Sequence, residues 1–376
     1  MARCRSAAPT ACSTRSRLRP PGFHRGASIR RNRKPIQSAR YIVRSDVQRA
    51  LVIGSAGNIG KVLTRHLRAV GYEVAEADIR PGWRDGYFMA DITQPLDLLP
   101  AFEWGPHVVF LLAASVGRMT CEQAGSLAIT TNLSGVNNVL QLCKQYRARC
   151  VFFSSSEVYG PHLDAMNDGG SLPRPNNRYG LSKLLGEQLV EYEVVNGGLR
   201  AVTLRPCMLY HEDEDVGDHR SAMIRFATNL VAGKPIEVHA GSARGWLHAD
   251  DAVRGIEAAG RLDHYAAINL GHPDIVPMLD LAEMIRAYVG ADPSLVRVKD
   301  LPPQMTLVKR PTLERQRRLL GLEPRISLAE GVRRVCIRQL RDAGREARAA
   351  GTPALLPPLS TNGAPRLDTE ISALPA

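Results

Sequence analysis

Ala50-Leu-Val-Ile-Gly54-Ser-Ala-Gly57-Asn-Ile-Gly60 is the stretch that decides the fold of this chain. A short, wholly apolar run is typical of a buried strand, and three glycines at this spacing are typical of the turn that leads from such a strand into a helix. A turn without Cβ atoms can approach a pyrophosphate, and the amides at the helix N-terminus attract the phosphate charge. The stretch therefore predicts a dinucleotide-binding unit.

Asp78 strengthens this interpretation because it closes the next strand candidate, residues 72–78. A carboxylate at about this distance from the glycines meets the hydroxyls of the adenosine ribose. It would also repel the 2′-phosphate of NADP, although Arg80, two residues later, softens that preference. We expect the cofactor to be NAD, with NADP as the less favoured alternative.

Strand-like and helix-like segments alternate from residue 46 onward, which argues for a parallel sheet covered on both faces. The fold class is therefore α/β, a doubly wound parallel Rossmann sheet. Its ligands should lie at the carboxyl ends of the strands, where Gly54, Asp78, Ala113 and Ser155 fall. The strand candidates are residues 50–53, 72–78, 87–90, 108–112, 150–154 and 201–205, and the helix candidates are 59–70, 127–146 and 179–194.

The alternation lapses after residue 205, where shorter segments separated by Gly and Pro indicate a smaller, discontinuous substrate domain. We expect a Rossmann domain over residues 46–205, with 246–269 returning to it as a helix at about 250–261. The substrate domain would then comprise residues 206–245 and 270–345. Residues 350–376 are rich in Ala, Pro, Ser and Thr and predict a disordered tail.

The charge of the chain is concentrated at its N-terminus. Residues 1–45 contain twelve Arg and Lys residues and no Asp or Glu, which accounts for the entire net charge of +12. The segment has no apolar periodicity, so we expect a disordered basic extension. It is a transit peptide, a basic arm, or upstream sequence ahead of a start near Val43 or Val47. Because the folded part is neutral, a nucleic-acid partner is disfavoured.

Cysteine and hydropathy patterns set further bounds. No run approaches the roughly 20 apolar residues that a membrane span needs, so we expect no membrane association. No cysteine pair has the spacing of a C-x-x-C or zinc motif, and reduced, packed thiols fit a cytoplasmic protein. The seven cysteines are Cys4, Cys12, Cys121, Cys143, Cys150, Cys207 and Cys336.

Tyr179 and Lys183 form a second chemical signal downstream. Positions i and i+4 share a helix face, so the ammonium is expected to lower the pKa of the phenol from about 10. The phenolate would then accept a substrate proton. Ser155, in a serine cluster at the end of a strand, supplies a hydroxyl for the same substrate oxygen. Together with the glycine turn, this pattern predicts hydride transfer from a hydroxyl to NAD.

Over residues 49–345 the chain resembles the extended short-chain dehydrogenase/reductase family, the NAD-dependent epimerases, dehydratases and decarboxylases of nucleotide sugars. The resemblance rests on motifs spread along the whole range. They are the G-x-x-G-x-x-G turn, Asp91-Ile92, Leu112-Ala-Ala114, Asn132, Ser154-Ser-Ser-Glu-Val-Tyr-Gly160, Tyr179-x-x-x-Lys183, Arg205-Pro206, Arg244-Gly-Trp-Leu-His-Ala-Asp250, Ile268-Asn-Leu-Gly271 and Lys309-Arg-Pro311 followed by Leu320-Gly321.

The resemblance implies a role for each matching position. The cofactor would be held by Gly54, Gly57, Asn58, Ile59, Gly60, Asp78, Asp91, Ile92 and Ala113, together with Tyr179 and Lys183. Ser155 matches the family's catalytic Ser or Thr, Tyr179 its base, and Arg205 and Arg244 its substrate-binding arginines. The implied first step is oxidation of a sugar carbon, usually C4, and the fate of the transient ketone decides the reaction.

Glu157 separates the branches of the family. Dehydratases usually carry Asp-Glu after the Thr, and here the Asp position is Ser156, which disfavours dehydration. The run Ser-Ser-Glu-Val-Tyr-Gly is similar to UDP-glucuronate decarboxylases, in which a 4-keto uronate, a β-keto acid, loses CO₂. Arg244 is then the candidate cation for the carboxylate or enolate, and Glu157 and Ser156 are the candidate catalytic residues that position the sugar ring. We expect decarboxylation of a UDP-uronic acid, with 4-epimerisation and then 4,6-dehydration as alternatives.

Several departures and alternatives remain open at the level of sequence. Met208 replaces an Asn that commonly contacts the substrate phosphates, so the nucleotide is not determined. His211-Glu-Asp-Glu-Asp215, with Asp218 and His219, can be drawn as a metal site, but we expect a solvated loop and no metal. An NAD(P)-sensing or scaffold protein is the non-enzyme alternative. The family's two-helix dimer contact, here the helices beginning at Leu127 and Tyr179, predicts a homodimer.

Overall fold

The computed structural model describes residues 47–161, 166–215, 221–302 and 305–345. All of these residues belong to one compact unit. The predicted N-terminal extension and C-terminal tail lie outside the described residues, as do Cys4, Cys12, Asp218 and His219. None of the helices in the described part of the chain combines the length and apolarity needed to cross a bilayer.

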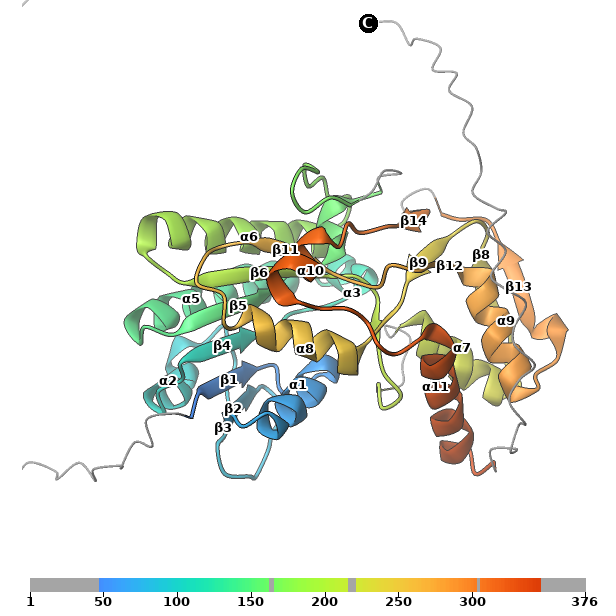
Figure 1. Ribbon diagram of the computed structural model, residues 1–376, viewed down its shortest axis with the longest axis horizontal. Helices are drawn as coiled ribbons and strands as arrows, with labels where there is room; N and C mark the ends of the chain where they lie inside the picture. Colours follow the sequence, from blue (N-terminus) through green and yellow to red (C-terminus); the bar gives the residue numbers. More distant parts are fainter. Residues whose placement is uncertain (1–46, 162–165, 216–220, 303–304, 346–376) are drawn as a thin grey trace, which may run out of the picture. The chain divides into compact units, whose positions relative to one another are not determined.

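A seven-stranded sheet forms the centre of this unit, and every neighbouring pair of its strands is parallel (Figure 1). The predicted doubly wound parallel sheet is therefore confirmed. The spatial order is β11 (Ala267–Leu270), β6 (Ala201–Pro206), β5 (Arg149–Phe153), β4 (Val108–Leu111), β1 (Arg49–Ile53), β2 (Glu73–Asp78) and β3 (Tyr87–Met89).

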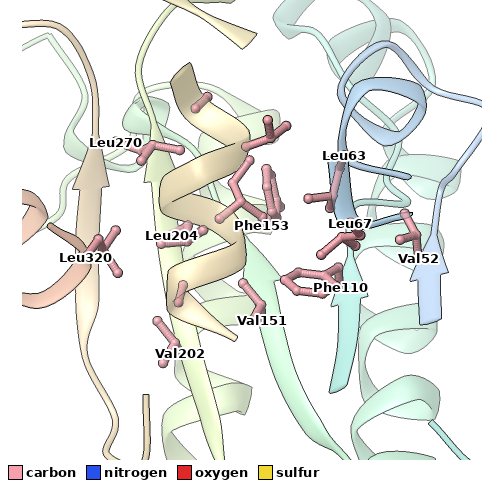
Figure 2. Packing of buried hydrophobic residues seen from close by; sticks show 14 of the residues in the cluster. Val52, Leu63, Leu67, Phe110, Val151, Phe153, Val202, Leu204, Leu270 and Leu320 are labelled. Carbon is pink, nitrogen blue, oxygen red and sulfur yellow. The ribbon is translucent and has the colours of Figure 1, made fainter. Parts of the chain in front are cut away.

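Both faces of the sheet are buried, which explains the unbroken apolar run of β1. Successive side chains of a strand point to opposite faces, so Ala50 and Val52 join one apolar cluster while Leu51 and Ile53 join another. The first cluster includes side chains of α1 (Asn58–Ala69) and α8 (Ala249–Ala259), and Figure 2 shows part of its packing. The second includes side chains of α2 (Pro95–Glu103), α5 (Val136–Gln145) and α6 (Arg178–Gly197).

The order of the strands reverses between β1 and β4. From β1 the chain builds outward to β2 and β3, and it then returns to β4 on the other side. Backbone amides of Leu112 and Ala113, just after β4, donate to the carbonyl oxygen of Ile53 at 2.9 and 3.0 Å. Ligands of doubly wound sheets bind outside the strand ends at such a reversal, and the candidate site lies there.

Beyond β6, a separate apolar cluster includes Tyr210, Trp246 and side chains of three further helices. These helices are α7 (Ala222–Val231), α9 (Met278–Val289) and α11 (Leu328–Asp342). The predicted division into two domains stays a prediction. Small sheets pair β7 (Leu209–Tyr210) with β10 (Leu247–His248), β8 (Ile236–His239) with β13 (Val296–Lys299), and β9 (Ala243–Gly245) with both β12 (Ile275–Pro277) and β14 (Val308–Lys309).

The single helix predicted over residues 127–146 is wrong in detail. A π-helical turn, Thr130–Gly135, separates α4 (Gly125–Ile129) from α5. Single-turn π segments inside helices are frequent at functional sites. Here the turn contains Asn132, which is fully buried and hydrogen-bonded to Ser115 and Ser182. Short helices also occur at α3 (Arg118–Gln123), α10 (Glu314–Leu320), Ser156–Tyr159 and Pro293–Leu295.

Candidate active site

Glycines are required in the turn after β1 because its backbone is tightly packed. Gly54 has φ +90°, and a Cβ atom there would lie 2.6 Å from the backbone nitrogen of Ala113. Gly60, in the first turn of α1, has no room for a Cβ atom beside the carbonyl oxygen of Gly54. Gly57 is the N-cap of α1. The N-terminus of this helix is therefore free of side-chain bulk, as a pyrophosphate site requires.

Asp78 ties this turn to the end of β2. Its side chain accepts hydrogen bonds from the backbone amides of Ala56 at 2.9 Å and Arg80 at 3.0 Å. The side chain is nearly buried, yet it lines the cleft described next. A carboxylate oxygen has capacity for more than one hydrogen bond, so Asp78 can hold its own turn and still accept a ribose hydroxyl.

A cleft of about 740 Å³ runs along the carboxyl ends of the strands. It brings together all the predicted cofactor residues with three of the predicted catalytic residues. The predicted site residues that line it are Gly54, Gly57, Asn58, Ile59, Gly60, Asp78, Asp91, Ile92, Ala113, Ser155, Tyr179 and Lys183, and Met208 also lines it. Four predicted residues do not line it: Ser156, Glu157, Arg205 and Arg244.

Ser155, Tyr179 and Lys183 meet at one part of this cleft. Ser155 follows β5 and caps the short helix Ser156–Tyr159, where its oxygen accepts the Glu157 amide at 3.2 Å. The hydroxyl of Ser155 lies near enough to the phenol of Tyr179 to lower its pKa. Lys183, one turn further along α6, donates from Nζ to the carbonyl oxygen of Phe153 at 2.7 Å. The end of β5 positions Ser155 and, through the Phe153 carbonyl, Lys183, while α6 carries both Tyr179 and Lys183.

The expected lowering of the Tyr179 pKa is wrong for this state of the protein. Burial raises the pKa of the phenol to about 12, outweighing the Ser155 hydroxyl, which lowers it, and the charge of Glu157 adds a smaller increase. The ammonium of Lys183 is bonded to a backbone carbonyl instead, and burial lowers its pKa to about 8. The i, i+4 spacing places both groups in the cleft without making the phenol acidic.

Glu157 lies beside this group and holds an ion pair that the sequence did not reveal. Its Oε1 pairs with Nζ of Lys309, and its Oε2 accepts a hydrogen bond from Nδ2 of Asn177 at 3.0 Å. The Nε of Arg118 lies 3.8 Å from Oε2. Burial would raise the pKa of Glu157, but Lys309, Arg118 and Asn177 hold it below its usual value. Glu157 is therefore an anion at neutral pH.

Asn177 connects this carboxylate to the helix of Tyr179. It is the N-cap of α6, where its Oδ1 accepts the amide of Gly180 at 2.9 Å, while its Nδ2 donates to Glu157. A Cβ atom at Gly180 would lie 2.5 Å from the Glu157 carbonyl oxygen. The start of α6 thus packs directly on the short helix that carries Glu157, which explains the glycine after Tyr179.

The predicted substrate arginines are both committed to protein partners. Arg205 forms a bidentate pair with Glu187 at 2.9 and 2.7 Å, and it also donates to the hydroxyl of Tyr159 at 2.9 Å. Burial would lower the pKa of Arg205, but Glu187 and Tyr159 raise it overall. Arg205 lines a second hollow of about 770 Å³, between α6 and α10, rather than the cofactor cleft.

Arg244 is buried on β9 and donates three hydrogen bonds to backbone carbonyls. Its Nη1 reaches the oxygens of Ala243 and Leu307, both at 2.7 Å, and its Nη2 reaches that of Thr306 at 2.6 Å. Burial lowers the pKa of its guanidinium to about 10. In the β9–β14 ladder, Arg244 pairs with Lys309, so the two cations share one end of the site. Lys309, not Arg244, forms the ion pair with Glu157.

The acidic segment after Tyr210 is not the solvated loop that we expected. His211 and Glu214 are buried, and Glu214 accepts hydrogen bonds from the amide and hydroxyl of Ser221 at 2.9 and 2.8 Å. Glu212 lies 2.9 Å from the buried His248, and Asp215 lies 3.1 Å from Lys61. Within the described residues, no cluster of His, Cys, Asp and Glu could hold a metal.

Ser156 and the cysteines play no visible part in the cleft. Ser156 is buried and its hydroxyl lies near the thiol of Cys207, whose pKa it lowers slightly against the larger effect of burial. The cysteines within the described ranges are all free and buried, as expected: Cys121, Cys143, Cys150, Cys207 and Cys336.

Comparisons with known proteins place this geometry in context. The model of the NAD dependent epimerase/dehydratase family matches residues 50–271. UDP-glucuronic acid decarboxylase 1 of Arabidopsis thaliana is 27% identical over 319 residues, which cover 76% of this chain and 68% of that protein. An uncharacterised protein of Methanocaldococcus jannaschii is 28% identical over 215 residues, which cover 55% of this chain and 64% of that protein. This chain therefore spans less than two thirds of that archaeal relative.

Among solved structures, the chain is similar to MoeE5 in complex with UDP-glucuronic acid and NAD. The two share 25% sequence identity with a TM-score of 0.71, and the match covers 78% of this chain and 99% of MoeE5.

Proposed function

The chain belongs to the NAD dependent epimerase/dehydratase family, and we propose that it decarboxylates a nucleotide-linked uronic acid through a transient 4-keto sugar. The observation that carries the proposal is the ion pair of Glu157 with Lys309 beside the phenol of Tyr179. Two similarities support it: a decarboxylase of UDP-glucuronic acid is a relative, and MoeE5 binds UDP-glucuronic acid.

The cleft fits NAD as its cofactor. The turn at Gly54 and Gly60 excludes side chains, the N-terminus of α1 offers backbone amides, and Asp78 presents a carboxylate that favours NAD over NADP. NAD held by these residues would supply the acceptor for the C4 hydride of the sugar and the donor that returns it. MoeE5 is a relative of similar fold that binds this cofactor.

Tyr179 is the base of this proposal and Ser155 is its hydrogen-bonding partner. With a pKa of about 12 in the free protein, the phenol holds its proton at neutral pH and needs a nearby positive charge to release it. Lys183, with its pKa near 8, is still largely cationic at pH 7 and lies in the same cleft. Binding of cofactor and sugar would have to draw its ammonium from the Phe153 carbonyl toward the phenol.

Once C4 is a ketone, the uronate is a β-keto acid. The C5–C6 bond breaks, CO₂ leaves, and the electron pair forms an enolate across C4 and C5, which then takes a proton at C5. Lys309 supplies positive charge to this step, and Glu157 and Asn177 hold that charge in place. Ser156, where a dehydratase carries an acid, is buried against Cys207 and offers no group to eliminate water.

Mass spectrometry of the products formed from UDP-glucuronate and NAD tests the proposal. The full chain should release a product that has lost CO₂, and Tyr179→Phe should release none. Lys309→Met should still oxidise C4, so NADH and a 4-keto uronate should accumulate. An unchanged mass with altered chromatographic mobility would mean 4-epimerisation, and loss of water would mean dehydration. No turnover, with NAD still bound, would favour a sensing or scaffold protein.

We also propose that the protein is a homodimer that pairs through the helices of residues 125–145 and α6. Apolar side chains of α6 are exposed to solvent, among them Leu181 at 43%, Tyr192 at 61% and Val195 at 73%. A contact across them would remove this apolar area from water. Light scattering of the purified chain should give twice the protomer mass, and a monomeric mass would contradict the proposal.

A further inference from the structure

Met208 lines the cofactor cleft, but the proposed function gives it no role. It follows β6, is half-buried, and lines the cleft together with Leu209. Met208 stands at the position where the resembling family commonly has an Asn that contacts the substrate phosphates. A thioether has no hydrogen to donate and accepts hydrogen bonds only weakly. Met208 therefore cannot replace an amide as a phosphate ligand, and its contribution to the cleft is of another kind.

The order of the strand ends indicates which part of NAD would reach Met208. Asp78 closes β2 and offers its carboxylate to the adenosine ribose, and the glycine turn after β1 leads to the N-terminus of α1, where a pyrophosphate binds. On the other side of β1 the sheet continues through β4, β5 and β6. A dinucleotide that crosses β1 in this direction therefore brings its nicotinamide half to the ends of β4, β5 and β6, and Met208 follows β6.

The two sides of the cleft differ in chemistry at this end. Tyr179 and Lys183 come from α6, whose apolar side chains pack into the second core cluster, on one face of the sheet. Ile59, from α1, and Leu209 pack against the first cluster, on the other face. Met208 packs against the cluster of α7, α9 and α11. All five side chains belong to residues that line the cleft, so an apolar side chain from outside α6 can support a ring that reacts on the α6 side.

A ring held between these sides has one face for the reaction and one for support. In the proposed function the C4 hydroxyl of the sugar lies at Tyr179, so the face of the nicotinamide turned toward α6 is the one that reacts. We propose that the thioether of Met208 packs against the opposite face of this ring. Sulfur is polarisable and contacts aromatic rings favourably, and the oxidised nicotinamide ring is a cation, which a polarisable neighbour stabilises. Met208 is then a cofactor residue at a position where the family commonly contacts the substrate, whichever way the ketone reacts.

Two cofactor probes separate contact with the ring from general support of the cleft. NAD and ADP-ribose share the adenosine, the pyrophosphate and the second ribose, and they differ at the nicotinamide. The full chain, freed of bound cofactor, would be titrated calorimetrically with each. Met208→Ala should weaken NAD binding roughly threefold to tenfold. ADP-ribose binding should change by less than about twofold, which also shows that the variant is folded. Met208→Leu should lose less than Met208→Ala because it keeps most of the apolar volume.

Met119→Ala is the matched control, because Met119 is 62% exposed and does not line the cleft. Both affinities should stay the same in this variant. Equal weakening of NAD and ADP-ribose by Met208→Ala, or no weakening of either, would overturn the contact with the ring.

Met208→Asn tests the alternative that this position faces the substrate. It should weaken NAD binding as Met208→Ala does, and it should leave the affinity for UDP unchanged. Stronger binding of UDP together with unchanged binding of NAD would mean that position 208 contacts the substrate phosphates, and would also overturn the proposal. None of these titrations requires turnover, so they give an answer even if UDP-glucuronate proves not to be the substrate.

Discussion

Replacing Lys309 with Met should destabilise the protein in a pH-dependent way. The change removes the ammonium from Oε1 of Glu157, whose side chain is only 14% exposed. Removing one partner of a buried ion pair lowers the free energy of unfolding by about 3–5 kcal/mol, because the other charge stays in the protein interior without a counter-charge. Asn177 and Arg118 still approach Oε2, so we expect the lower end of that range, about 3 kcal/mol.

The direction of the pH dependence follows from the pKa of Glu157. In the native protein this pKa lies below the ordinary 4.5, so the ion pair contributes stability above that pH and loses it as the pH falls through the folded value. Without Lys309, burial dominates and the pKa of Glu157 should rise above its ordinary value. The carboxylate then takes up a proton on mild acidification, so the cost of the substitution should be largest at pH 7.5 and shrink toward pH 4.5.

Thermal unfolding at pH 7.5 and pH 5 measures the effect. A loss of about 3 kcal/mol should lower the midpoint by roughly 5–10 °C at pH 7.5. Lys299→Met is the matched control: its partner Glu237 forms an ion pair whose two side chains are 54% and 55% exposed, so its midpoint should hardly move. Adding Glu157→Gln to Lys309→Met should restore most of the loss. An unchanged midpoint at pH 7.5, or no rescue by Glu157→Gln, would refute the reasoning.

Three further predictions concern the cleft. Gly60→Ala should abolish NAD binding in a calorimetric titration, because the added Cβ overlaps a carbonyl oxygen of the turn; undiminished affinity would contradict this packing. Tyr179→Phe should produce no NADH absorbance with any nucleotide sugar while still binding NAD, and residual turnover would remove Tyr179 as the base. Asp215→Asn should raise the affinity for NADP relative to NAD severalfold, because the carboxylate lies 3.8 Å from Arg80 and offsets its charge. Asp213→Asn is the control: Asp213 pairs with Arg338 and not with Arg80, so this change should leave the ratio of NADP to NAD affinity unchanged.

Local patterns in the sequence were sufficient for the parts of the site that lie on single elements. The apolar run of β1 predicted a strand buried on both faces because its alternate residues enter two different cores. The glycine turn and Asp78 were predictable because both sit at strand ends, and parallel strands bring their ends to one edge. The same logic placed Ser155 in the cleft, whereas Tyr179 and Lys183 were predicted from their i, i+4 spacing on one helix.

Pairings between distant segments were not predictable in this way. Lys309 lies 152 residues after Glu157, and it reaches the carboxylate through the short β9–β14 ladder, which has no periodic signal of its own. The Lys-Arg-Pro motif marked the position without indicating its partner. Helix α2 was not predicted because Pro100 lies inside it, and a Pro within a helical pattern usually indicates a helix end.

The pKa values of the catalytic side chains were also not predictable from residue spacing, because they depend on burial and on neighbouring groups. The i, i+4 relation of Tyr179 and Lys183 predicted an acidified phenol. Burial instead raises the pKa of Tyr179 and lowers that of Lys183, whose ammonium is bonded to the Phe153 carbonyl and not to the phenol. Likewise, the acidic run after Tyr210 has the composition of a solvated loop, yet its Glu212, Asp213 and Asp215 side chains bind partners on distant segments.

Two of the side-chain hydrogen bonds of Asn177, those with Gly180 and Glu157, restrict how this position can change over evolutionary time. Serine, threonine and aspartate begin helices about as well as asparagine does, so a lineage could ordinarily drift among them. Here the cap oxygen serves α6 while the amide nitrogen, on the same side chain, serves Glu157. Aspartate would start the helix but set a second negative charge against Glu157, and the shorter hydroxyls have only one polar atom for two partners. A related protein that lacks Glu157 no longer needs an amide nitrogen at position 177, so other helix-capping residues could replace Asn177. Substitutions at the two positions are therefore expected to occur together.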